Sequence, residues 1–201
     1  MNYLAIDTSG SHLTVVLKIQ GKLYTVYNEN CGVLHSTALM PAVENLLEQA
    51  CATLSQVDFI ACVVGAGSFT GIRIGISTVK ALCYALKKPC LRVTSFDTLA
   101  YDTIDGDALC VIDAKHGSFY AQRYDNFNEV TNAEFISGEE LLNFANGSKI
   151  VCSSNIPFEY QKGDLLNGLI NAVEKNADKI TQDLEELTPL YIRKSQAEEN
   201  R

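Results

Sequence analysis

The sequence is short of positive charge. Its 201 residues hold 16 Lys and Arg against 24 Asp and Glu, which gives a formal net charge of −8. Proteins that grip nucleic acid by themselves present a basic face to the phosphates. The charge balance therefore argues against this chain as an independent nucleic-acid binder.

Other absences narrow the class of protein further. No apolar stretch is long enough to cross a membrane, and the N-terminus carries no basic leader. The seven cysteines are dispersed and form no C-x-x-C pair, so they do not show the usual spacing of a zinc site. We expect a cytoplasmic protein whose cysteines are reduced and mostly serve as small core residues.

The sequence is also poor in histidine, with only His12, His35 and His116. No two of them lie within one helical turn, so a metal site built on a helical H-x-x-x-H pair is excluded. Nothing pairs a nucleophile with a base either. The sequence therefore predicts no catalytic residues and no metal ligands, and His35 is singled out only because it stands at the entry of a predicted helix.

The apolar residues follow an α/β pattern. Strands are predicted over 3–7, 12–19 and 22–28, with Gln20 and Gly21 as a two-residue turn between the last two. A helix over 36–54, a strand over 58–65 and a helix over 71–87 follow. A second half begins near Gly106 and holds further strands and two helices. We predict a first lobe over 1–103 and a smaller second lobe over 104–201.

A glycine-rich loop, "VVGAGSFTGIRIG", joins the strand over 58–65 to the following helix. It lacks the Lys of a Walker A loop. It also misses the dinucleotide fingerprint, because Thr70 stands where the third glycine belongs. A tight strand-to-helix turn and an anion held by free N–H groups remain as alternatives. Gly71 and Gly75 are four residues apart, which indicates another backbone close to this helix.

Five segments resemble one family. "GAGSFTGIRIG" is similar to the signature of the TsaB family, also called YeaZ, of bacterial tRNA threonylcarbamoyladenosine (t6A) biosynthesis proteins. "LAIDTS", "HSTALMPAVENLL", "VIDAKHGSFYAQRY" and "TPLYIR" resemble its other segments. Ala66 and Lys115 depart from the family pattern. The family motif loop corresponds here to Gly65, Gly67, Ser68, Phe69, Thr70, Gly71 and Arg73.

The resemblance implies an actin-like ATPase (ASKHA) fold of two RNase H-like lobes, the second one reduced. It implies a non-catalytic subunit that binds and activates TsaD, the transferase that places threonylcarbamoyl on adenosine 37 of tRNA. A TsaE-type ATPase joins the complex. The chain would contact tRNA only through this complex. A homodimer of the isolated chain is left open.

The resemblance also suggests two sets of site residues. The predicted partner interface lies on the two helices of the first lobe and comprises Leu39, Met40, Val43, Leu47, Gly71, Gly75, Ile76 and Val79. A degenerate nucleotide site would comprise Asp7, Thr8, Ser9 and Asp113, with ATP or ADP at the partner interface left open. The alternatives are an independent ATPase or sugar-kinase-like phosphotransferase, and a metallopeptidase, which the missing histidine cluster disfavours.

The charge balance leads to a prediction about tRNA. At physiological salt the isolated chain should bind tRNA only weakly, because phosphate contacts supply most non-specific affinity. An electrophoretic mobility shift titration measures this directly. A shift at low-micromolar protein, with no partner present, would contradict the prediction.

Overall fold

The computed structural model describes residues 1–193, which divide into two compact units. Unit 1 comprises Met1–Val93 and Val173–Pro189, and unit 2 comprises Thr94–Ala172 and the residues from Leu190 on. Unit 1 thus includes residues 173–189, whereas the predicted first lobe ends at residue 103. The predicted lobes, 1–103 and 104–201, stay a prediction.

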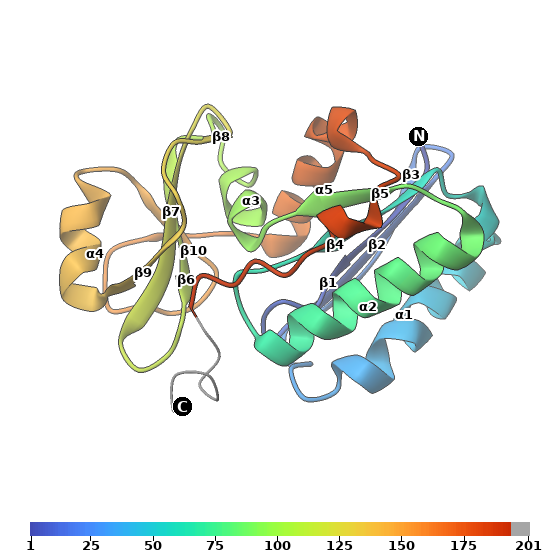
Figure 1. Cartoon of the computed structure of the whole chain (residues 1–201), viewed down its shortest axis with the longest axis horizontal. Coiled ribbons are helices and arrows are strands. Elements are labelled where there is room, and N and C mark those ends of the chain that lie inside the picture. The colour runs from blue at the N-terminus through green and yellow to red at the C-terminus, as the bar shows by residue number, and fades with distance from the viewer. Residues whose placement is uncertain (194–201) are drawn as a thin grey trace. The chain divides into compact units, whose positions relative to one another are not determined.

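Unit 1 is built on a five-stranded sheet, sheet A (Figure 1). Its strands are β1 (Tyr3–Asp7), β2 (Leu13–Ile19), β3 (Lys22–Asn28), β4 (Phe59–Val63) and β5 (Cys90–Val93), in the order β3-β2-β1-β4-β5. The first three are antiparallel neighbours, as predicted, and β4 runs parallel to β1 and β5. Gln20 and Gly21 both have positive φ and form the predicted turn.

Two helices cover one face of sheet A. Helix α1 (His35–Ala50) packs on β2 and β3, while α2 (Phe69–Leu86) packs beside it on β4 and β1 (Figure 1). Helix α1 ends four residues before the predicted Leu54, because Cys51 adopts a left-handed backbone conformation with φ of 50°. A short 3-10 helix, η1 (Leu54–Gln56), follows instead.

The returning segment closes unit 1 on the side of β5. It holds the 3-10 helices η2 (Ala177–Lys179) and η3 (Leu184–Glu186). Between them Thr181 exchanges two backbone hydrogen bonds with Cys90, of 2.8 and 2.9 Å, and so shields the outer edge of β5. Near its start, Glu174 accepts hydrogen bonds from Lys18 and from the Tyr3 hydroxyl.

Unit 2 contains the second sheet, sheet B, and three helical segments. Its strands are β6 (Ala108–Asp113), β7 (Ser118–Asp125), β8 (Asn128–Glu129), β9 (Glu134–Ser137), β10 (Ile150–Cys152) and β11 (Gln161–Lys162). The order is β11-β10-β6-β7-β8, with β9 also paired to β7. The helices are α3 (Ser95–Ala100), α4 (Gly138–Ala145) and α5 (Leu165–Lys175), and the division between the units falls within α5.

Local signals explain the helices of unit 2. Ser137 and Glu140 form a capping box at the start of α4. Gly168, inside α5, has a packing reason. A Cβ at this position would lie 1.7 Å from the Thr98 carbonyl oxygen, so only glycine lets α5 pass α3 this closely.

All seven cysteines are free thiols, and six of them are buried, as predicted, while Cys51 is exposed. Among the described residues, no helix has the length and apolar character needed to cross a membrane.

Candidate functional site

The family motif loop forms the junction between β4 and α2. Ser68 is the N-cap of α2, and its hydroxyl accepts a hydrogen bond from the Gly71 N–H at 3.2 Å. Ser68 therefore satisfies one of the N–H groups that a helix start leaves unpaired.

The glycines of this loop make room for the segment that follows β1. A Cβ on Gly67 would lie 2.2 Å from the Ser9 carbonyl oxygen, and one on Gly71 would lie 2.1 Å from the Thr8 carbonyl oxygen. A Cβ on Gly75 would approach the Thr8 hydroxyl to 2.5 Å. These three positions form a groove, the glycine groove, and Thr8 and Ser9 lie in it.

Two hydrogen bonds hold the segment in the glycine groove. The Ser68 N–H donates to the Ser9 carbonyl at 2.6 Å, and the Thr8 hydroxyl donates to the Gly71 carbonyl at 2.7 Å. The spacing of Gly71 and Gly75 did indicate a close backbone. That backbone belongs to this chain, so the loop serves as a seat for the segment after β1.

A buried ion pair lies at the start of the same segment. Asp7 Oδ2 is 2.9 Å from His12 Nε2, and Asp7 Oδ1 accepts a hydrogen bond from the Ser9 N–H at 2.8 Å. Asp7 is 1% exposed and His12 is 7% exposed. The His12 ring also stacks on Tyr27, with centroids 6.1 Å apart.

The two partners shift each other's pKa. Burial by itself raises the pKa of Asp7, but the charge of His12 and the hydrogen bonds from His12 and Ser9 outweigh it and leave that pKa below its usual range. Burial likewise opposes protonation of His12, yet the Asp7 carboxylate raises the pKa of the ring above its usual value. Each shift favours the charged form of its group, as expected for an ion pair.

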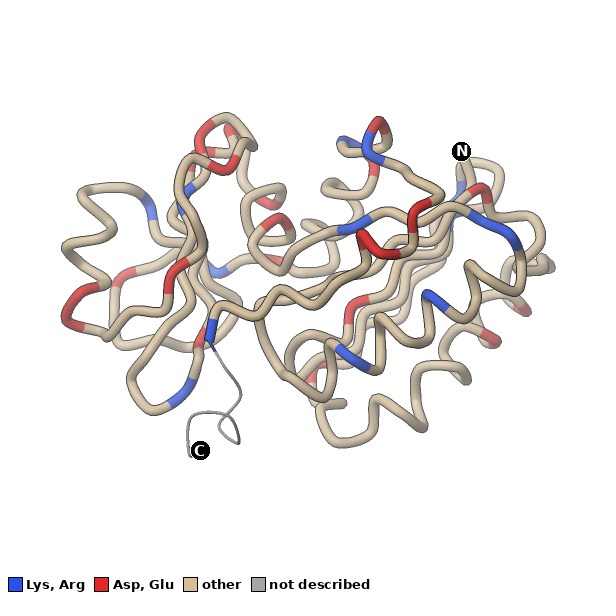
Figure 2. The backbone as a smooth tube through the Cα atoms, viewed as in Figure 1, with Lys and Arg blue, Asp and Glu red and all other residues tan. Residues whose placement is uncertain are grey.

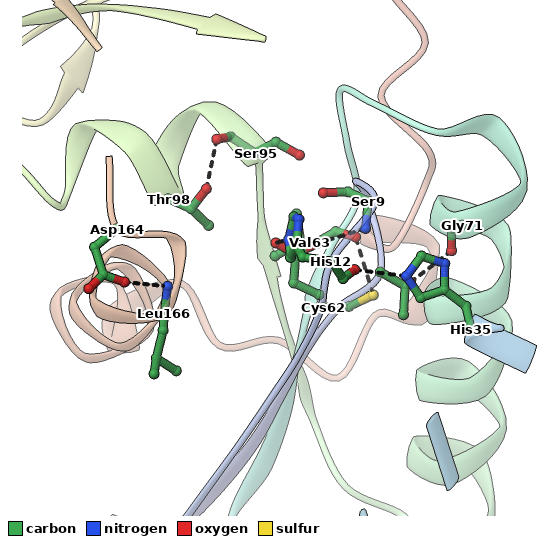
Figure 3. A network of polar contacts seen from close by, with 12 residues as sticks. Ser9, His12, His35, Cys62, Val63, Gly71, Ser95, Thr98, Asp164 and Leu166 are labelled. Atoms are coloured by element: carbon green, nitrogen blue, oxygen red, sulfur yellow. Dashed lines mark hydrogen bonds and ion pairs between the residues drawn. The ribbon is translucent and has the colours of Figure 1, made fainter. Parts of the chain in front are cut away.

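His35 joins this cluster from the first turn of α1. Its Nε2 lies 2.7 Å from the His12 carbonyl oxygen, and the side chain is buried (Figure 3). Because a carbonyl only accepts, Nε2 carries the proton. Within residues 1–193, His35 Nδ1 is buried and has no hydrogen-bond partner. The geometry gives His35 a structural contact that ties α1 to the same segment.

The residues of the predicted nucleotide site lie in both units. Asp7, Thr8 and Ser9 are buried in unit 1, and both Asp7 oxygens already accept hydrogen bonds from the protein. Asp113 ends β6 in unit 2, where its carboxylate accepts from the Lys115 backbone N–H and ammonium, each at 2.8 Å. The nucleotide site stays a prediction.

Unit 2 contains a cavity of about 660 Å³ that reaches Asp113. Its apolar lining comes from Phe119, Leu142, Ile156 and Phe158. Phe119 and Phe158 meet edge to face, with ring centroids 5.8 Å apart. Asp113 is the only residue of the predicted sites among its lining residues.

The residues of the predicted partner interface lie mostly inside unit 1, and the interface itself stays a prediction. Six of the eight residues are buried within unit 1, namely Leu39, Val43, Gly71, Gly75, Ile76 and Val79. The apolar stripes of α1 and α2 face their own sheet, and the glycines face Thr8 and Ser9. Only Met40 and Leu47 are partly exposed.

Sequence reasoning did not single out the exposed aromatic residues of α2. Tyr84 is 82% exposed, and Phe69 is 40% exposed with the Arg73 guanidinium 3.8 Å from its ring centroid. Helical periodicity could have found these residues, since Arg73, Ser77 and Tyr84 recur on the side opposite the apolar stripe.

Comparisons with known proteins agree with this fold and loop. A family model described as "TsaD: tRNA N6-adenosine threonylcarbamoyltransferase" matches residues 26–196. Among solved structures, YeaZ from Pseudomonas aeruginosa is 25% identical with a TM-score of 0.76, covering 94% of this chain and 99% of that one. A second Pseudomonas aeruginosa protein, described as similar to peptidase YeaZ, is 26% identical with a TM-score of 0.78, covering 96% and 99%.

Curated relatives carry a more specific name. The tRNA threonylcarbamoyladenosine biosynthesis protein TsaB of Bacillus subtilis is 34% identical over 130 residues, which are 64% of this chain and 57% of the relative. The protein of the same name from Escherichia coli is 30% identical over 128 residues, or 62% of this chain and 55% of the relative. The chain thus spans less than three fifths of the length of these relatives.

The fold and the family model together define the class, an actin-like (ASKHA) protein of the TsaD family. Within this family, the chain belongs to the TsaB (YeaZ) group.

The glycine groove gives a direct stability prediction. Gly71→Ala should destabilise the protein by about 1–3 kcal/mol, because the new methyl group overlaps the Thr8 carbonyl, even though alanine favours a helix. Thermal and urea unfolding measure the loss. The control is Gly32→Ala, whose Cβ would make only an ordinary contact of 3.5 Å with Ser11. Native stability of Gly71→Ala would contradict the role of the groove.

The ion pair gives a pH prediction. The raised pKa of His12 contributes stability below about pH 6.5, and this contribution is lost as pH rises through the folded pKa. The lowered pKa of Asp7 contributes stability above about pH 3.9, which is lost as pH falls through the folded pKa. Asp7→Asn should therefore cost about 3 kcal/mol, most of all between these two values.

Urea unfolding from pH 3 to pH 9 tests the Asp7→Asn variant against wild type. The control is Asp125→Asn, which changes an exposed carboxylate. A stability difference for Asp7→Asn that does not vary with pH would show that the pair is not charged in the folded protein.

Proposed function

We propose that this chain is a non-catalytic subunit that binds and activates a TsaD-type transferase in t6A modification of tRNA. The membership of the TsaB group carries this proposal, because curated relatives are named for this biosynthesis. The TsaD-type partner would supply the transfer of threonylcarbamoyl to adenosine 37. A TsaE-type ATPase is the further expected partner, and tRNA would be reached through the complex.

The state of the motif loop supports a binding role. Thr8 and Ser9 fill the space beside its three glycines. Both carboxylate oxygens of Asp7 accept hydrogen bonds from within the protein. A phosphotransferase of this fold needs such a carboxylate for its metal–nucleotide. The geometry therefore favours a subunit over the alternative of an independent ATPase. Binding of ATP or ADP at the partner interface stays a prediction.

The outer faces of α1 and α2 are the proposed contact surface. The inner faces are occupied by sheet A, whereas the outer face of α2 exposes Phe69 and Tyr84. Aromatic side chains are enriched among the residues that dominate binding energy. Two adjacent helices can supply the roughly 800 Å² per partner that a stable interface buries.

The charges of the two helices add specificity to this surface. The carboxylates of α1 are Glu44 and Glu48, and α1 has no Lys or Arg. Helix α2 carries Arg73 and Lys80 and no carboxylate (Figure 2). A partner with the opposite arrangement of basic and acidic helices would be steered into a single orientation.

Exchanging an exposed aromatic residue tests the surface. Tyr84→Glu should weaken binding to the cognate TsaD-type subunit by about tenfold or more, since a buried carboxylate replaces an aromatic contact. The fold should be retained, because Tyr84 is exposed. Co-purification and calorimetric titration measure the affinity.

The matched control is Ile104→Glu, which changes a fully exposed apolar residue of unit 2. This variant should bind like wild type. If Tyr84→Glu also retains native affinity, the outer face of α2 is not the contact surface. If wild type fails to bind the cognate subunit, the proposed function itself is wrong.

A further inference from the structure

We propose that the cavity of unit 2 that reaches Asp113 binds a small organic cation with an aromatic body. The aromatic body would lie against the apolar lining, and the ammonium group would bind the Asp113 carboxylate. This inference rests on unit 2 alone and is independent of the proposed function.

The cavity lies at the carboxyl ends of two parallel strands. Strand β6 ends at Asp113, and its parallel neighbour β10 ends at Cys152. Residues 155–158, which follow β10, and the start of α4 contribute to the lining. Ligands of α/β sheets commonly bind outside the carboxyl ends of the strands. A volume of about 660 Å³ is also within the usual range of small-molecule sites.

The apolar lining suits a flat ring. Phe119 is buried in the core of unit 2, and the partly buried Phe158 packs edge to face against it. A Cβ on Gly138 would lie 3.3 Å from the tip of the Phe158 ring, so this ring is held between β7 and α4. Leu142 also lines the cavity and is 57% exposed. A ligand ring would cover Leu142 and complete the packing around Phe158.

The charges at the cavity favour a cation. Asp113 and Glu139 both line it, and no Lys, Arg or His is among its described lining residues. The carboxylates would attract an ammonium group and repel a phosphate or a carboxylate. Because the rest of the lining is largely apolar, water competes less for this charge than it does at an open surface.

The start of α4 does not offset these negative charges. Its Gly138 N–H donates to the Gly117 carbonyl at 3.0 Å, and its Glu140 N–H donates to the Ser137 hydroxyl at 3.3 Å. The first turn also carries Glu139 and Glu140. An anion would therefore meet carboxylates and N–H groups that are already in use.

Asp113 already binds one primary ammonium group. Lys115 Nζ lies 2.8 Å from Asp113 Oδ2, while the Lys115 backbone N–H donates to Oδ1 at 2.8 Å. The Lys115 side chain is 75% exposed, and an exposed ion pair of this kind contributes little free energy. A ligand ammonium can replace Lys115 Nζ at Oδ2, while the backbone N–H keeps the carboxylate oriented.

An indole probe tests the site, because the chain contains no tryptophan. Titration of tryptamine, followed by its own indole fluorescence, should show saturable binding to one site. Tryptophol carries a hydroxyl in place of the ammonium, and indole-3-propionate carries a carboxylate. Each should bind about tenfold more weakly or worse, because the charge-assisted hydrogen bond to Asp113 is lost.

Variants with opposite expected effects locate the ammonium group. Asp113→Asn should weaken tryptamine binding by about tenfold. Lys115→Gln should strengthen it by about twofold to fivefold, since a competing ammonium is removed. Leu142→Arg places a cation at the lining and should weaken binding as Asp113→Asn does. The matched control is Glu134→Gln, which changes an exposed carboxylate outside the lining and should bind like wild type.

Circular dichroism checks the fold of each variant. The proposal is overturned if tryptamine shows no saturable binding, or if tryptophol binds as tightly as tryptamine. It is also overturned if Asp113→Asn and Leu142→Arg bind like wild type, or if Lys115→Gln weakens binding. ATP should not displace tryptamine, because its phosphates would meet the carboxylates. Displacement by ATP would make the cavity a nucleotide site and would equally overturn the proposal.

Discussion

The structure of unit 1 depends on one contact, the seating of Thr8 and Ser9 in the glycine groove. The backbone carbonyls of these residues occupy the space that side chains at Gly67 and Gly71 would fill. Two hydrogen bonds then tie the start of α2 to the end of β1. A motif that looks like a phosphate loop is thereby explained by packing, since its glycines accept protein backbone. The position of α2, and with it of the outer helical face, follows from this contact.

The Asp7–His12 pair fixes the conformation of the seated segment. Removing two charges from water is costly, and a buried pair compensates only when further hydrogen bonds satisfy its remaining atoms. Here the Ser9 N–H satisfies the second oxygen of Asp7. The pair therefore holds the chain between Asp7 and His12 in one bend, and His35 extends the support to α1 through the His12 carbonyl. Both helices of the proposed contact surface are anchored to the same few residues.

Residue patterns predicted most helices and strands of the fold, but they did not predict which segments pack against one another. The predicted strands lie within one residue of the observed bounds of β1, β2 and β3. β1 and β2 were visible as apolar or β-branched runs because nearly all of their residues are buried. The two-residue strands β8 and β11 were missed, since so few residues carry no periodicity, and β9 was missed as well. The glycine spacing in α2 correctly indicated a close backbone, yet spacing does not say whose backbone it is. Most of the predicted interface residues are buried, because the apolar stripe of a surface helix faces its own core.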